Sequence, residues 1–132
     1  MRTLLAVDDN ESVLAVLDLL LSPQGYSIVR AASGARALAL ATETQIDGAI
    51  IDIHMPVMNG FEACRVLRER ATAGGHDLPV WLITGAYSRE AVERAKQVGA
   101  LDVFQKPFDF AAMLLALESG FNRPPAKTGP AS

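Results

Sequence analysis

The chain has 132 residues, of which 50% are hydrophobic and 20% charged, with a formal net charge of −3. This length fits one domain with its own core, and a mildly acidic chain without a Lys/Arg cluster gives no electrostatic reason to bind nucleic acid. No apolar run reaches the roughly 18 residues of a membrane span. Asp8 and Asp9 interrupt the apolar N-terminus too early for a signal peptide, and the single Cys64 excludes an internal disulfide. We therefore expect a cytoplasmic protein without a membrane partner.

The first half of the chain alternates short apolar runs with helical patterns. In chain order it predicts a strand at 3–7, a helix after Asn10, a strand at 26–31, a helix after Ser33 and a strand at 48–52. Asn10 and Ser33 are good N-caps, since a short side-chain oxygen can accept a hydrogen bond from the first turn of a helix.

The second half continues the alternation. It predicts a helix from Gly60 to about Arg70, a strand at 78–84, a helix at 88–98, a strand at 101–106 and a last helix that begins at Phe108 or Asp109 and ends near Phe121. Asn59 and Glu62 have the spacing of a capping box, and Gly99 is a natural helix end. We assign residues 1–121 to one domain and residues 122–132, rich in Pro, Ala and Gly, to a disordered tail or linker stub.

The strands are apolar along their whole length rather than alternating. Such strands are typical of a parallel sheet that helices cover on both faces. Because crossovers between parallel strands are right-handed, we predict a doubly wound α/β fold. It would have a five-stranded parallel sheet in the order 2-1-3-4-5 flanked by five helices.

Polar side chains follow four of the five predicted strands. They are Asp8 and Asp9 after the first, Asp52 at the end of the third, Thr84 at the end of the fourth and Lys106 at the end of the fifth. The carboxyl ends of parallel strands meet at one edge, where ligands bind in folds of this kind. Two carboxylates about 4 Å apart repel by roughly 4 kcal/mol at an effective dielectric of about 20. We therefore expect a cation among them, and an all-oxygen ligand set suits Mg²⁺.

A metal-bound carboxylate beside a Lys and a Thr can handle a phosphoryl group. Asp52 is the natural nucleophile and would form an aspartyl-phosphate. Mg²⁺ would neutralise the incoming oxygens, while Lys106 and the Thr84 hydroxyl hold the others.

Four short motifs carry a resemblance to a known family. They are Val7-Asp-Asp-Asn10, Asp52-Ile-His-Met-Pro56 with Met58-Asn-Gly60, Thr84-Gly85 and Lys106-Pro-Phe108. In this order and at strand ends, they resemble the receiver domain of two-component response regulators, and the match covers about residues 3–121.

The resemblance implies a signalling switch that catalyses only its own phosphorylation and dephosphorylation. Asp52 would accept phosphate from a sensor histidine kinase or phosphotransfer protein. Asp9, Asp52 and the backbone carbonyl of His54 would ligate Mg²⁺, with Asp8 acting partly through water. Thr84 and Lys106 would detect the phosphoryl group, and Lys106-Pro107 would be a cis peptide. The resemblance also allows a homodimer.

One position departs from the family pattern. The family usually has Tyr or Phe three residues before the Lys, where this chain has Val103, and strand alternation places Phe104 on the opposite face. The usual coupling between Thr and an aromatic ring is therefore in question. His54 and Ala86 stand where the family tunes phosphate lifetime.

Two other functions are alternatives to a phosphoacceptor receiver. A pseudo-receiver would use the fold as a phosphorylation-independent protein-binding module; Val103 favours it mildly, and the complete acidic set opposes it. An enzyme of flavodoxin-like fold would hold a nucleotide or flavin, but no Gly-rich loop follows the first strand and Asp8-Asp9 would repel phosphate.

Overall fold

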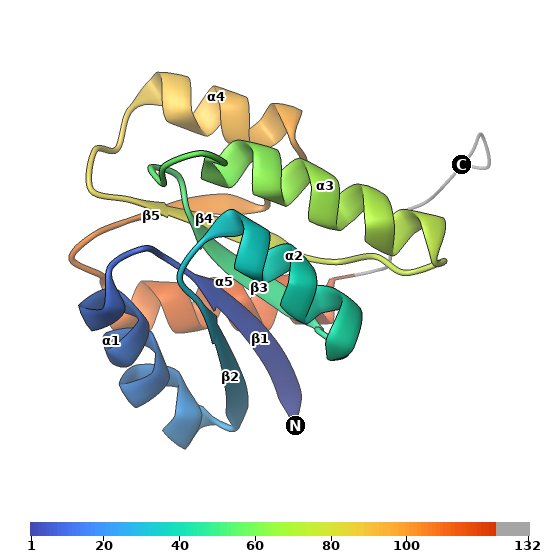
Figure 1. Cartoon of the computed structure of the whole chain (residues 1–132). Coiled ribbons are helices and arrows are strands. Elements are labelled where there is room, and N and C mark those ends of the chain that lie inside the picture. The colour runs from blue at the N-terminus through green and yellow to red at the C-terminus, as the bar shows by residue number, and fades with distance from the viewer. Residues whose placement is uncertain (124–132) are drawn as a thin grey trace.

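The computed structural model describes residues 1–123 and contains a five-stranded parallel sheet in the order β2-β1-β3-β4-β5. The strands are β1 (Arg2–Val7), β2 (Tyr26–Ala31), β3 (Gly48–Asp52), β4 (Val80–Thr84) and β5 (Asp102–Gln105). The helices are α1 (Glu11–Leu21), α2 (Gly34–Glu43), α3 (Gly60–Ala73), α4 (Arg89–Gln97) and α5 (Phe110–Asn122). Figure 1 shows the helices covering the sheet on both faces. The predicted fold class and strand order are confirmed.

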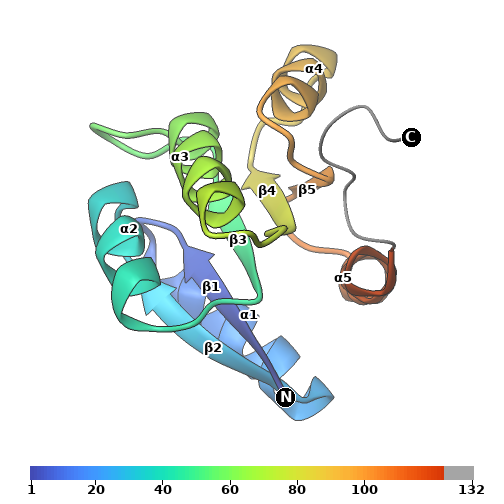
Figure 2. The same ribbon diagram turned by 90° about the vertical axis from the view of Figure 1, so that its right-hand side faces the viewer.

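Two apolar clusters hold the layers together, one on each face of the sheet. The first joins the inner side chains of α2, α3 and α4 to the sheet, and the second joins those of α1 and α5 to the other face. Figure 2 shows α5 apart from α3 and α4, with β4 and β5 between them. Every residue of the central strands β3 and β4 is buried, which is why both strands are apolar up to their last residues, Asp52 and Thr84.

Side-chain caps fix where most helices begin, as the sequence predicted. Asn10, Ser33 and Ser88 each accept a hydrogen bond from the first turn of their helices. Asn59 and Glu62 form the complete capping box at the start of α3, and Asp109 caps α5. These caps satisfy backbone N–H groups that have no partner inside the helix.

Some element boundaries differ from the prediction. A short 3-10 helix, Ser22–Gln24, follows α1, and α3 continues to Ala73 rather than stopping near Arg70. Asn122, assigned to the tail, is instead the last residue of α5. The Phe121 ring packs 5.3 Å from that of Trp81, and Arg123 pairs with Asp77 at 2.7 Å, so the end of the helix is held down. The rest of the predicted tail, 124–132, lies outside the described residues.

Across residues 1–123, we find no helix with both the length and the apolar character needed to cross a bilayer.

Candidate functional site

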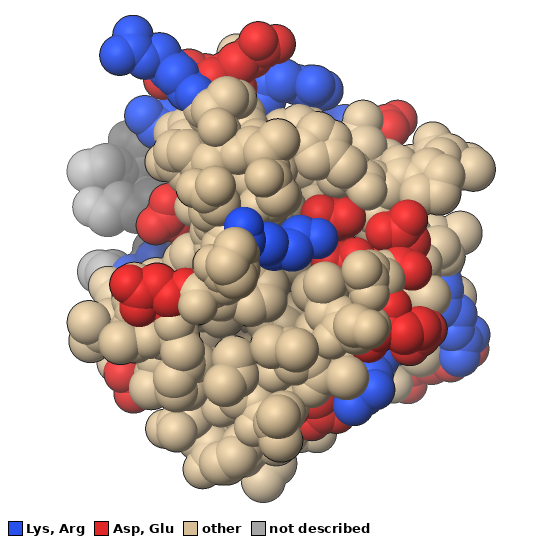
Figure 3. Space-filling model, turned by 90° about the vertical axis from the view of Figure 1, so that its left-hand side faces the viewer, with Lys and Arg blue, Asp and Glu red and all other residues tan. Residues whose placement is uncertain are grey.

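The polar strand ends meet at the carboxyl edge of the sheet, as the topology requires. Val7 lies opposite Ile51 in the β1–β3 pair, and Asp52 lies opposite Ile83 in the β3–β4 pair. The residues that follow these strands therefore leave the sheet at the same level. Figure 3 shows acidic side chains gathered around a basic one on this side of the molecule.

Three carboxylates form the centre of the site. Asp8 and Asp52 are 0% and 3% exposed, Asp9 is exposed, and one oxygen from each lies within 4.8 Å of the others. Burial and the neighbouring charge of Asp8 together raise the pKa of Asp52, because both disfavour its ionised form. The cluster is electrostatically costly without a cation among its oxygens.

Lys106 supplies one positive charge. Its Nζ lies 2.9 Å from Asp8 Oδ2 and 3.3 Å from Asp52 Oδ1, so one ammonium bridges both buried carboxylates. Burial opposes the charged ammonium, but the hydrogen bond to Asp8 and the charges of both carboxylates outweigh it and raise the pKa of Lys106. Lys106 is therefore cationic at neutral pH and holds the two carboxylates in place.

Backbone N–H groups orient the acidic side chains. The N–H of His54 donates to the Asp52 carboxylate, and the N–H of Asn10 donates to Asp8 Oδ1 at 2.9 Å. His54 is exposed, and its imidazole is outside the three-carboxylate cluster. Its contact with the site is thus through the main chain; that its carbonyl ligates a metal stays a prediction.

Thr84 lies at the end of β4 with 0% exposure. Its Oγ1 accepts a hydrogen bond from the Ala86 N–H at 3.0 Å. This hydrogen bond connects the hydroxyl to the loop between β4 and α4. If the hydroxyl changed its hydrogen-bond partner, the position of this loop would therefore change as well. The sequence placed Thr84 at the site without showing this hydrogen bond.

The loop between β3 and α3 is held tightly against Asp52. A Cβ on Gly60 would lie 2.3 Å from the Asp52 backbone oxygen, and the Gly60 N–H donates to the Ile53 carbonyl at 2.9 Å. Only glycine allows the chain to return so close to the strand. Val57, with a φ of 71°, adopts a left-handed conformation that is costly for a β-branched residue, so the surrounding contacts must hold the loop in this path.

The fifth strand agrees with the prediction. The Lys106-Pro107 peptide is cis. Val103 is 5% exposed and joins the cluster beneath α2, α3 and α4, whereas Phe104 packs against the α1/α5 cluster. The two side chains therefore lie on opposite faces of the sheet.

The donor set fits a hard divalent cation. All candidate side-chain ligands are carboxylate oxygens, which Mg²⁺ prefers. Asp8, Asp9 and Asp52 would hold such an ion. With the ammonium of Lys106 beside it, the edge could accommodate a phosphoryl group next to Asp52.

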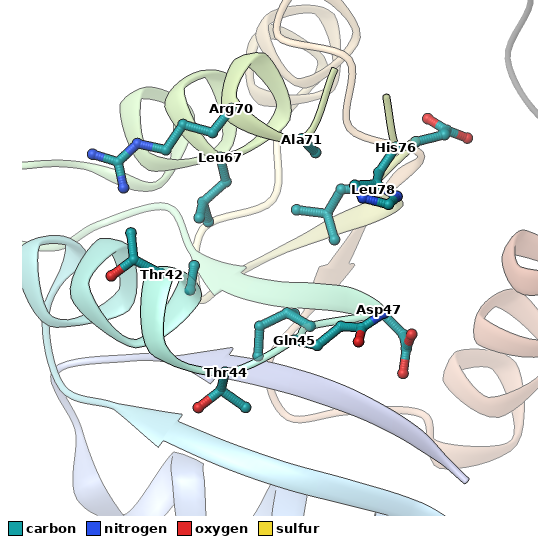
Figure 4. Close-up of a pocket in the computed structure, with 12 residues that line it drawn as sticks. Thr42, Thr44, Gln45, Asp47, Leu67, Arg70, Ala71, His76 and Leu78 are labelled. Atoms are coloured by element: carbon teal, nitrogen blue, oxygen red, sulfur yellow. The ribbon is translucent and has the colours of Figure 1, made fainter. Parts of the chain in front are cut away.

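A separate cavity of about 580 Å³ lies away from these residues. Figure 4 shows it between α2, α3 and the first residues of β3, with Thr44, Asp47, Leu67 and His76 among the residues around it. It contains none of the predicted site residues. Asp47 is already engaged there, since its Oδ2 accepts the Thr3 N–H at 2.7 Å.

Comparison with known proteins agrees with the geometry. A family model described as the response regulator receiver domain matches residues 4–118. Response regulator MprA of Mycobacterium sp. (strain KMS) is 33% identical over 129 residues, which are 98% of this chain and 54% of that protein. Transcriptional regulatory protein PrrA of Mycobacterium tuberculosis is 34% identical over 119 residues, 90% of this chain and 49% of that protein. The chain thus spans about half the length of the curated relatives it matches.

Solved structures have the same overall fold. The Vibrio cholerae chemotaxis protein CheY4 superposes with a TM-score of 0.82 at 34% identity, over 91% of this chain and 98% of that one. A putative response regulator from Chloroflexus aurantiacus superposes with a TM-score of 0.84 at 30% identity, over 92% and 98%.

Proposed function

The chain belongs to the response regulator receiver domain family, and we propose that it is a phosphoacceptor whose Asp52 receives a phosphoryl group from a histidine kinase or a phosphotransfer protein. The observation that supports this most directly is the buried Asp52 carboxylate, 3.3 Å from the Lys106 ammonium and within one cluster with Asp8 and Asp9. An acceptor needs such a carboxylate beside groups that can neutralise three phosphoryl oxygens.

In the proposed transfer, an Asp52 oxygen attacks the phosphorus of a phosphohistidine. The new P–O bond forms as the P–N bond breaks, and the imidazole leaves with the electron pair and takes up a proton. Lys106 stabilises the charge of the phosphoryl oxygens. Hydrolysis reverses the switch: water attacks the phosphorus, and Asp52 leaves as a carboxylate. The chain would catalyse only these two reactions on itself.

Mg²⁺ is the proposed cofactor. Asp8, Asp9 and Asp52 would hold it with the His54 carbonyl, and it would neutralise the carboxylates and the phosphoryl group together. The proposed setting is the cytoplasm, where a kinase and its receiver meet.

Intact mass spectrometry tests the proposal. The protein is incubated with acetyl phosphate and Mg²⁺, beside samples with EDTA and beside Asp52→Asn. We expect the mass of one phosphoryl group on the unaltered protein, dependent on Mg²⁺ and absent from the variant.

Failure would be informative in two ways. No added mass, in a folded protein that Mg²⁺ still stabilises, would favour a binding module of the same fold. No added mass and no response to Mg²⁺ would overturn both the acceptor and the metal site.

A further inference from the structure

Helix α4 is held to the rest of the domain by little apolar surface. All of α4 lies within the described residues, and Ala95 is its one buried side chain. Ala91 and Val92 are partly buried against the cluster beneath α2, α3 and α4. A helix with so few buried contacts depends on individual side chains for its position.

Arg94 makes one such contact. Its guanidinium carbon lies 4.2 Å from the centroid of the Phe61 ring, at the start of α3. Phe61 is 5% exposed, while Arg94 is exposed and lies over the ring. A guanidinium over an aromatic face is attracted by the ring electrons, and its aliphatic stem covers apolar surface. Arg94 therefore joins α4 to the first turn of α3.

Phe61 in turn adjoins the Asp52 site. It follows Gly60, whose close approach to the Asp52 backbone leaves no room for a side chain. Arg94 and Phe61 also line a cavity of about 250 Å³ together with His54, whose N–H donates to the Asp52 carboxylate. Gly60, Phe61 and Arg94 thus connect the Asp52 backbone to α4.

A second connection reaches α4 at a different point. The Thr84 hydroxyl accepts the Ala86 N–H, and the chain continues directly to Ser88, the N-cap of α4. This link controls the beginning of the helix, whereas Arg94 lies in its second turn. The Phe61–Arg94 contact is therefore placed to set the direction of α4 once its start is fixed.

We propose that Arg94 is a positioning residue that couples α4 to the Asp52 site through Phe61. The inference rests on the proposed function, because the event it transmits is phosphorylation of Asp52. A shift of the loop that carries His54 and Gly60 moves the Phe61 ring, and the ring moves α4 through Arg94. Coupling of this kind is reciprocal, so the position of α4 also affects the loop.

Amide hydrogen exchange on the unmodified full chain tests the physical link. Arg94→Ala is compared with Arg94→Lys, which keeps a cation over the ring, and with Arg89→Ala, an exposed Arg on the same helix outside the contact. We expect Arg94→Ala to raise exchange about two- to fivefold in both α4 and residues 53–60, the factor that a contact of about 0.5–1 kcal/mol represents. Arg94→Lys should restore most of the protection, and Arg89→Ala should leave residues 53–60 unchanged.

The same measurement after acetyl phosphate and Mg²⁺ tests the coupling. Phosphorylation should change exchange in α4 of the unaltered protein and of Arg94→Lys. In Arg94→Ala, the phosphoryl mass should still appear while the response of α4 falls at least twofold.

The outcomes test the Arg94 link and the proposed function separately. Unchanged exchange of residues 53–60 in unmodified Arg94→Ala would overturn the link, as would a full response of α4 in phosphorylated Arg94→Ala or none in the unaltered protein. If no protein gains phosphoryl mass, the proposed function fails, and exchange in the unmodified proteins still decides whether Arg94 joins α4 to the loop.

Discussion

Asp52, the acid that the sequence predicts as the nucleophile, is buried in a crowded set of charges. Its exposure is 3%, and Asp8, which is fully buried, lies in the same cluster. Lys106 bridges the two and offsets part of the repulsion. Nevertheless, burial and Asp8 leave the pKa of Asp52 raised. Ionised Asp52 is therefore a destabilising group in the folded chain.

The raised pKa of Asp52 predicts the direction in which its substitution changes the free energy of unfolding. Because the pKa of Asp52 is raised in the folded state, its ionisation costs stability at neutral pH, and the cost disappears as the pH falls through the folded-state pKa toward the ordinary 3.8. Without Mg²⁺, we expect Asp52→Asn to raise the free energy of unfolding at pH 7 by about 1 kcal/mol, a common gain when an unfavourable charge is removed. Urea denaturation at pH 7 and pH 4 measures this.

Asp102→Asn is the matched control, since Asp102 is an exposed Asp on β5. The gain in Asp52→Asn should shrink as the pH falls to 4, because protonation of the wild-type carboxyl removes the cost of its buried charge. An equal gain at both pH values, or a loss at pH 7, would contradict the raised pKa.

Some site residues could be predicted from the sequence because local rules place them. Asp8, Asp52 and Thr84 follow apolar runs, and the rule that parallel strands end at one edge brings them together. The contact between Arg94 and Phe61 has no such local signature. It depends on how α3 and α4 pack side by side on one face of the sheet, and neither residue differs from an ordinary surface cation or core aromatic in the sequence.

At the scale of elements, helix starts were better predicted than helix ends. Asn59 and Asp109 mark the starts of α3 and α5, because their side chains accept hydrogen bonds from the first turns of these helices. The end of α5 depends instead on tertiary contacts. Phe121 packs against Trp81 and Tyr26, and Arg2 lies over its ring at 4.4 Å, so the last turn persists beyond the predicted boundary.

The packing of Gly120 against Trp81 gives a prediction for α5. A Cβ on Gly120 would lie 2.3 Å from Trp81 Cζ2 and 2.9 Å from Leu101 Cδ1. Alanine favours a helix by about 1 kcal/mol over glycine, but overpacking typically costs about 1–3 kcal/mol. We therefore expect Gly120→Ala to lower the free energy of unfolding by up to about 2 kcal/mol and to alter Trp81 fluorescence.

Ser119→Ala separates helix propensity from packing, because Ser119 is the exposed neighbour on the same helix. It should raise stability by a few tenths of a kcal/mol and leave the fluorescence unchanged. If Gly120→Ala were equally stabilising, α5 would not be packed against Trp81 as described.

For the whole molecule, the sheet topology was predictable because the strands are mainly apolar rather than alternating and each is followed by a helix. That arrangement alone brings carboxylates from β1 and β3 to within 4.8 Å of one another. Cavities between helices, such as the one near Asp47 and His76, could not be predicted, because they depend on the lengths and packing of α2 and α3 together.

A ligand that binds only the folded chain stabilises the whole domain, which makes the assembled carboxyl edge measurable in solution. The three carboxylates come together only when β1 and β3 pair, so Mg²⁺ should bind the unfolded chain far more weakly. At a Mg²⁺ concentration of 100 times Kd, the free energy of unfolding should rise by about 2.7 kcal/mol.

Thermal unfolding in EDTA and in increasing Mg²⁺, with NaCl matching the ionic strength, measures this rise. Asp9→Asn should reduce it strongly, because Asp9 is an exposed member of the cluster whose loss leaves the core intact. An equal rise in Asp9→Asn, or in NaCl alone, would mean that Mg²⁺ acts by screening charge and not at this edge of the sheet.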